Sequence, residues 1–130
     1  RTGGTRLRGG GGVIPLFALV LSVVSPDPEP LRAAVEGCER ASLSELTRAE
    51  PRRRAEWAGA VYAEQRAIAA ARAGLVPLDP AQAPVRAALD QRQQQLDDAR
   101  AVERAWRDYY DEYRADFLAS CSGRRRDDGK

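Results

Sequence analysis

The second half of the chain carries the longest hydrophobic pattern. Between Val85 and Phe117, ten positions are separated by alternating steps of four and three residues, and eight of them are apolar or aromatic. They are Val85, Leu89, Arg92, Leu96, Ala99, Glu103, Trp106, Tyr110, Tyr113 and Phe117. This spacing is typical of a helix that packs along a partner helix, as in a coiled coil. Arg92 and Glu103 interrupt the stripe. We expect both to extend to solvent, with pairing across the interface as the alternative.

The preceding segment shows helical spacing in two stretches. The first contains Leu31, Val35, Cys38, Ser42, Leu46 and Ala49, and the second contains Trp57, Val61, Ile68, Ala71 and Leu75. Joining them requires a phase shift through Arg53, close to Pro51, whose missing N–H removes a helical hydrogen bond. The sequence therefore predicts a first arm that is kinked or broken near Pro51. A capping-box pattern at Thr47–Glu50 favours a true break.

A proline-rich segment, 75–84, separates the two patterns. Gly74 is suited to end the first arm and Pro84 to begin the second. The sequence thus predicts an all-α fold, a long antiparallel helical hairpin in which the numbers of facing residues sum to about 159. Cys38 then faces Cys121, and we expect one disulfide to close the open end of the hairpin.

A three-helix bundle is the competing topology, with segment 31–48 folded back against segment 51–74. In that bundle Cys38 lies about 39 Å along the axis from Cys121. A disulfide requires Cα atoms within about 7 Å of each other. We therefore expect the fold-back and the disulfide to exclude each other, and we favour the collinear hairpin.

Residues 1–26 have the pattern of an export signal. A basic stretch, 1–8, precedes an apolar run at 13–24. As a helix this run spans about 18 Å, too short for a hydrocarbon core of about 30 Å. A basic stretch, an apolar run and a small-residue exit are typical of a signal peptide, here with cleavage after Ser22 or Ser25. An uncleaved membrane anchor at 13–24 is the alternative.

The remaining boundaries follow from composition. Proline-rich residues 27–30 are expected to form an extended linker before the hairpin domain at 31–123. Residues 124–130 are polar and charged, and we expect a disordered tail. An even number of cysteines after an export signal predicts an oxidising location, periplasmic or secreted. If the leader is retained, the protein is anchored to the membrane by residues 13–24.

The composition argues against several classes of function. The chain contains no His, and its two cysteines are not spaced as a C-x-x-C pair, so imidazole catalysis and thiolate metal sites lack their usual residues. The formal net charge is +2, but three of the 21 basic residues lie in the leader, leaving 18 against 19 acidic residues. We expect no enzymatic activity, cofactor, metal, nucleic acid or small-molecule substrate. Segment 52–54, which is all Arg, is interpreted as a source of ion pairs across the hairpin.

Aromatic residues crowd the half of the hairpin that lies away from the loop. Trp57, Trp106, Tyr109, Tyr110, Tyr113 and Phe117 all belong to it. Core packing accounts for those on the stripe, whereas Tyr62 and Tyr109 lie beside it. Tyr and Trp are common anchors of protein interfaces. Tyr62, Trp106, Tyr109 and Tyr110 are therefore the candidate interaction surface.

Two stretches resemble a known family. The sequences A-V-Y-A-E-Q-R-A around Tyr62 and E-R-A-W-R-D-Y-Y-D-E-Y-R around Trp106 are similar to small exported helical proteins of the lysozyme-inhibitor type. The resemblance covers about residues 50–121. This chain departs from the pattern in having only two cysteines and a longer first arm, so no inhibitory residue is carried over.

The functional expectation is an exported periplasmic protein that acts through contact with another protein of the cell envelope. The resemblance implies inhibition of a cell-wall hydrolase. The alternative is a membrane-tethered structural spacer of the envelope, with residues 13–24 retained as the tether.

Overall fold

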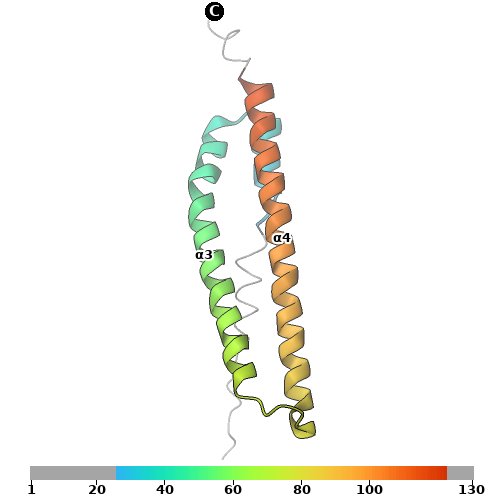
Figure 1. Ribbon diagram of the computed structural model, residues 1–130. Coiled ribbons are helices and arrows are strands. Elements are labelled where there is room, and N and C mark those ends of the chain that lie inside the picture. The colour runs from blue at the N-terminus through green and yellow to red at the C-terminus, as the bar shows by residue number, and fades with distance from the viewer. Residues whose placement is uncertain (1–25, 123–130) are drawn as a thin grey trace, which may run out of the picture.

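The computed structural model describes residues 26–122, which form three α-helices and one 3-10 turn. The elements are α2 (Glu29–Glu36), α3 (Arg40–Ala73), η1 (Pro80–Gln82) and α4 (Ala83–Cys121). Helices α3 and α4 lie side by side and antiparallel, with the loop at one end and α2 packed near the other (Figure 1). Because no strand occurs within 26–122, the predicted all-α helical hairpin is confirmed for this part of the chain. The predicted leader and charged tail lie outside it, apart from Pro26.

The stripe on α4 packs against α3 as predicted. Leu96 and Ala99 are buried in one cluster with Val61 and Ile68 of α3. Val85 is the exception, since 48% of its surface is exposed. Glu64 and Arg92 face each other across the two helices and are joined by hydrogen bonds. Their numbers sum to 156, against the expected 159, so the predicted register holds to within a helical turn.

Helix α2 folds back against the hairpin instead of extending α3. Figure 1 shows it behind the upper part of α4. Its buried face belongs to a core cluster formed by Leu31, Ala34, Val35, Leu43, Tyr110, Phe117 and Cys121. Glu29 and Pro30 form its first turn, so the predicted linker at 27–30 is shorter than expected. The expectation of a collinear first arm is wrong.

The chain reverses at residues 37–39. Cys38 adopts a left-handed backbone conformation, with φ of 51°, and Glu39 is extended. The predicted disulfide is confirmed: Cys38 and Cys121 are bonded, with their Cα atoms 5.5 Å apart. Because the reversal occurs at the bridged cysteine itself, fold-back and disulfide coexist. The expectation that they exclude each other assumed that the chain turned at Pro51.

Helix α3 continues through Pro51, and the predicted break there is not found. Figure 1 shows a helix that curves over its length. The Thr47 hydroxyl donates to the carbonyl of Leu43 at 2.8 Å, so Thr47 acts inside the helix and not as a cap. Glu50 is buried, whereas Ala49, expected in the interior, is exposed. The phase shift expected near Pro51 is therefore not a break in the helix. It reflects interior positions of α3 that are occupied by charged residues such as Glu50.

Replacement of Pro51 by Ala is expected to stabilise the protein. Pro51 is exposed inside a continuous helix, and Ala restores the N–H that bonds the carbonyl of Thr47. We expect Pro51→Ala to raise the free energy of unfolding by about 1–3 kcal/mol, since proline costs about 3 kcal/mol within a helix. Urea unfolding of the oxidised proteins measures the difference. A less stable variant would show that α3 needs proline to hold its curvature.

Candidate functional site

The disulfide-linked end of the molecule, formed by α2 with the adjoining parts of α3 and α4, contains a network of buried charges. The exposed fraction is 6% for Glu50 and 2% for Glu103. Arg53 lies between them and donates two hydrogen bonds to each carboxylate, at 2.8 and 3.0 Å. Its guanidinium thus joins α3 to α4 in the bidentate geometry that makes such pairs strong.

Further donors complete the network. Glu50 accepts from Arg54 Nε at 2.8 Å and from Trp106 Nε1 at 2.8 Å. Glu103 accepts from Arg107 Nε at 2.9 Å. The buried carboxylates are therefore surrounded by donors, as burial of a charge requires. The interpretation of segment 52–54 as a source of ion pairs across the hairpin is confirmed through Arg53.

A second buried pair lies nearer the loop. Glu64 has no exposed surface, and Arg92 of α4 donates to both of its oxygens, at 2.8 and 2.9 Å. This pair and the Arg53–Glu103 pair correct the expectation that Arg92 and Glu103 extend to solvent. Each finds a partner across the helix interface.

The environment of Glu50 favours its ionised form. Burial by itself raises the pKa of Glu50, but the hydrogen bonds from Arg53, Arg54 and Trp106 outweigh it. The balance of these effects lowers the pKa of the Glu50 carboxyl from 4.5 to about 2. The same network raises the pKa of Arg53, because its bonds to Glu50 and Glu103 outweigh the effect of burial.

The stability contributed by Glu50 is expected to disappear in acid. A carboxyl with a pKa lowered in the folded state stabilises that state above pH 4.5, and the contribution is lost as the pH falls through about 2. We expect the difference in unfolding free energy between the parent and Glu50→Gln to shrink by about 3 kcal/mol over that interval. Urea titrations at several pH values measure it. A difference that does not change with pH would contradict the low pKa.

The four residues of the predicted aromatic surface do not lie together in the structure. Trp106 and Tyr109 are half-buried, with ring centroids 5.9 Å apart, and Tyr113 continues the row at 4.3 Å from Tyr109. Tyr110 is only 4% exposed and belongs to the core, which corrects its place on the surface. Tyr62 is 64% exposed on α3, where Arg66 lies over its ring. The aromatic row, defined as Trp106, Tyr109 and Tyr113, does not include it.

Two hollows flank Trp106 on the side of α2. One, of about 320 Å³, lies between the start of α2 and the two long helices, above Glu50 and Arg53. The other, of about 310 Å³, is bordered by Val102, Trp106 and Tyr109. Pro26 lines both hollows. The aromatic row therefore lies beside an indented, mostly apolar surface.

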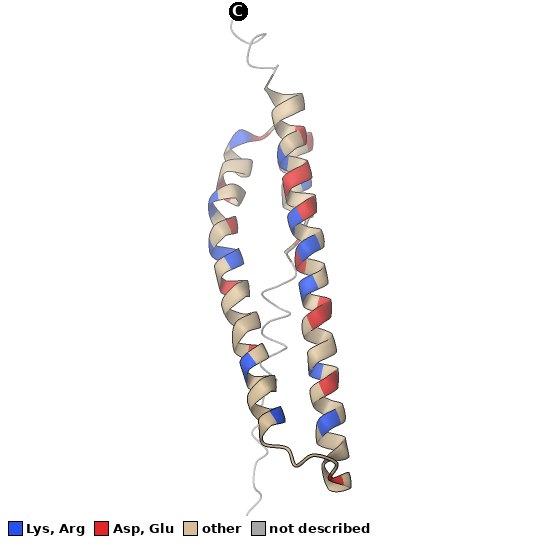
Figure 2. Cartoon of the chain, in the orientation of Figure 1, with Lys and Arg blue, Asp and Glu red and all other residues tan. Residues whose placement is uncertain are grey.

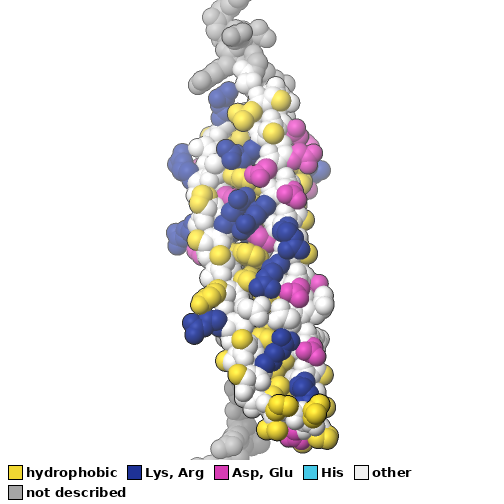
Figure 3. Space-filling model, in the orientation of Figure 1, with side chains coloured by type: hydrophobic (Ala, Val, Ile, Leu, Met, Phe, Trp, Pro, Cys, Tyr) yellow, Lys and Arg dark blue, Asp and Glu magenta, His cyan; other side chains and the backbone are white. Residues whose placement is uncertain are grey.

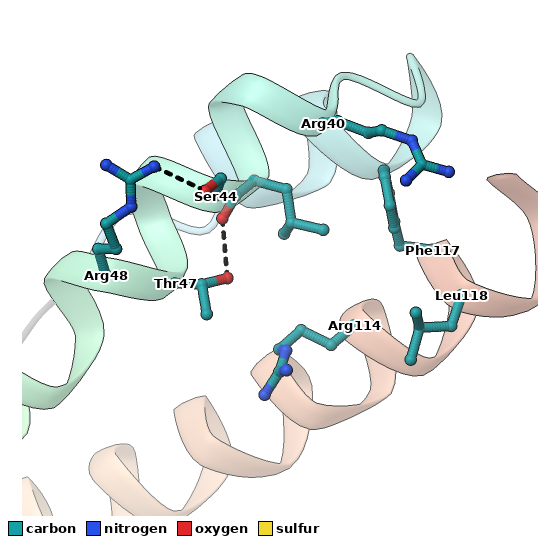
Figure 4. A pocket seen from close by; sticks show the side chains of 8 residues that line it. Arg40, Ser44, Thr47, Arg48, Arg114, Phe117 and Leu118 are labelled. Atoms are coloured by element: carbon teal, nitrogen blue, oxygen red, sulfur yellow. Dashed lines mark hydrogen bonds between the residues drawn. The ribbon is translucent and has the colours of Figure 1, made fainter. Parts of the chain in front are cut away.

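The opposite face of the same helices contains a third hollow. It has a volume of about 390 Å³ and lies between the start of α3 and the end of α4. Arg40, Arg48, Arg114, Phe117 and Leu118 are among its lining residues, and Figure 4 shows them around the open space. Its arginines lie outside the apolar stripes of the sequence, and no periodic signal marks them.

Charges of both signs are distributed along the long helices. Figure 2 shows basic and acidic residues along both α3 and α4. Within residues 26–122, no group of His, Cys, Asp and Glu is arranged to hold a metal ion. In the same part of the chain, no helix has the length and apolarity needed to cross a membrane.

These features define a disulfide-linked α-helical hairpin with a short third helix packed at its open end. Comparison of the chain with protein-family models, curated proteins and solved structures finds no match. The resemblance to lysozyme inhibitors thus stays a prediction. The disulfide is typical of proteins from non-reducing compartments.

Proposed function

We propose that this chain is an exported helical protein that acts by contacting another protein of the cell envelope. The observation that carries the proposal is the aromatic row on a surface held in place by the disulfide. Half-buried Trp106 and Tyr109 border an apolar hollow together with Val102, which is 48% exposed. Fixed aromatic side chains beside an apolar hollow are typical of the centre of a protein interface.

The disulfide supports this proposal in a second way. It joins the turn at Cys38 to the end of α4, and so holds α2 beside the aromatic row. A surface fixed before binding loses less conformational entropy on association than a mobile one. Formation of the bridge requires an oxidising compartment, which fits the export signal expected at residues 1–26.

Capture of a partner tests the proposal. The oxidised protein is cross-linked in an envelope extract and the captured proteins are identified, with a lysozyme inhibition assay beside it. We expect Tyr109→Ala to abolish capture and Tyr62→Ala, the control on a separate surface, to leave it unchanged. Equal capture by both variants would show that the aromatic row is not the surface that contacts the partner. If lysozyme is neither bound nor inhibited, the hydrolase-inhibitor form of the proposal fails.

A membrane-tethered spacer is the second candidate function. The 39 residues of α4 form a rod about 58 Å long, a shape that suits separation of two structures. The intact mass of protein recovered from cells decides between the candidates. Loss of the residues up to Ser22 or Ser25 removes the tether and favours the soluble protein, whereas a retained leader favours the spacer.

A further inference from the structure

The two faces of the α3–α4 pair are not equally covered at the disulfide-linked end. On one face α2 inserts Leu31, Ala34 and Val35 between the long helices. On the other face the hollow beside Phe117 is lined only by residues of α3 and α4 (Figure 4). An adjoining hollow of about 250 Å³ continues along the same junction and shares Thr47 and Arg114 with it. We call the two hollows together the arginine groove.

The arginine groove has basic walls over an apolar floor. Arg40 and Arg48 lie on α3 and Arg114 on α4, and Figure 3 shows basic side chains along this junction. Among residues 26–122, none of these three arginines has a carboxylate partner within 4.0 Å. The floor includes Phe117, and Leu118, 65% exposed, stands at the rim.

The inner part of the groove also contains a donor without a partner. Arg54 uses Nε to bind Glu50, but its Nη2 is buried and has no hydrogen-bond acceptor. Asp111 lies on the same hollow and is exposed. Positive charge therefore predominates: four arginines line the groove, against one exposed and one buried carboxylate.

We propose that the arginine groove binds an acidic amphipathic helix of a partner protein. Apolar side chains of such a helix pack against Leu118 at the rim and approach Phe117 on the floor, while its carboxylates meet the guanidinium groups on the walls. This goes beyond the proposed function, because the groove lies on the opposite face from the aromatic row, and it rests on that proposal only in requiring a protein contact.

The shape of the groove favours a helix as the occupant. From Arg40 to Arg54 the groove follows 15 residues of α3, a rise of about 21 Å between the first and the last, or about four helical turns. Helix α2 already shows that a helix packs between α3 and α4 at this level. A free phosphate group would satisfy the arginines and leave the apolar floor uncovered.

A pair of synthetic peptides tests the proposal. Both are 18-residue amphipathic helices with leucine on one face, and the polar face is all glutamate in one and all lysine in the other. Binding to the oxidised full chain is followed by fluorescence anisotropy at two salt concentrations. We expect saturable binding of the glutamate peptide, weakened by salt, and no binding of the lysine peptide.

Matched charge variants locate the binding. We expect Arg48→Ser with Arg114→Ser to raise Kd about tenfold, as loss of two exposed ion pairs predicts. The control, Arg66→Ser with Arg104→Ser, removes the same charge from exposed positions elsewhere and is expected to leave Kd within about twofold. Circular dichroism and thermal unfolding establish that both double variants remain folded.

Several results would overturn the proposal. Equal binding of the two peptides would show that opposite charge does not drive the binding. Equal Kd values for the two double variants would show that the binding does not take place in the arginine groove. A dimer of the chain that dissociates only in the groove variant would assign the surface to a second copy. The protein could also bind phosphatidylglycerol vesicles more strongly than the glutamate peptide. If that binding is lost only in the variant Arg48→Ser with Arg114→Ser, the groove would be assigned to a lipid surface.

The outcomes distinguish the groove from the wider function. If Tyr109→Ala abolishes capture of an envelope protein and the groove variant does not affect either capture or peptide binding, the protein-contact function stands and the groove assignment fails. If the glutamate peptide binds as expected and no envelope protein is captured, the proposed function fails while the groove keeps its ligand chemistry.

Discussion

Removal of the Cys38–Cys121 disulfide is expected to lower the free energy of unfolding by about 4.5 kcal/mol. The bridge joins residues 83 apart in sequence, so it restricts a large part of the unfolded chain. The double variant Cys38→Ser with Cys121→Ser leaves no single thiol that can form unwanted bridges. Urea unfolding of this variant and of the oxidised parent measures the difference. Equal stability of the two proteins would contradict the structural role of the disulfide.

The loss is expected to begin at the end where α2 packs. Without the bridge, α2 is held by its short apolar face, whereas the cluster around Ile68 and Leu96 keeps all its contacts. Amide hydrogen exchange of the double variant should accelerate first in α2 and the last turn of α4. Uniform acceleration, including the amides around Ile68, would show that the bridge stabilises the hairpin as a whole.

Replacement of Arg53 by Met is expected to destabilise the protein by about 3–5 kcal/mol. Arg53 donates to both Glu50 and Glu103, and its loss leaves two buried carboxylates facing each other. Arg54 and Arg107 remain, but each contacts only one of the carboxylates. Urea unfolding at neutral pH measures the effect.

Arg52→Met is the matched control for Arg53→Met. The Arg52 side chain is 85% exposed and pairs with Glu56 on the surface of α3. We expect a change within about 0.5 kcal/mol, because exposed ion pairs contribute little. If both variants lose the same stability, the buried network does not account for the effect, because Arg and Met have nearly the same helix propensity.

The sequence predicted the parts of the fold that depend on local signals. The stripe from Leu89 to Phe117 places α4 against a partner helix, and Gly74 and Pro84 mark the helix ends beside the loop. The register then paired the cysteines correctly. These features follow from apolar spacing and from the backbone preferences of Gly and Pro, which act over a few residues.

The fold-back of α2 had no comparable signal. Its turn uses a left-handed conformation at Cys38, a residue type that rarely adopts it, while Pro51 offered a stronger indication of a break. Glu50 and Arg53 continue the interior spacing from Leu43 to Trp57, but both are charged and therefore do not belong to the apolar pattern. Their ion pairs depend on contacts between helices that local sequence does not specify.

The candidate site was predicted in part. Trp106 and Tyr109 lie together on the surface as expected, whereas Tyr110 is buried because α2 covers it with Leu31 and its neighbours. The arginine groove was not predicted. It lies on the side of the long helices that α2 leaves uncovered, and the turn that places α2 was itself not predicted.

The position of α2 is the central claim, because both the aromatic surface and the arginine groove depend on it. Nuclear Overhauser effects between the Leu31 methyl groups and the Tyr110 ring test it most directly, since both side chains border the hollow above Glu50. We expect these effects in the oxidised protein. Their absence, together with a helix that continues from α3 through residues 37–39, would contradict the fold-back and the groove with it.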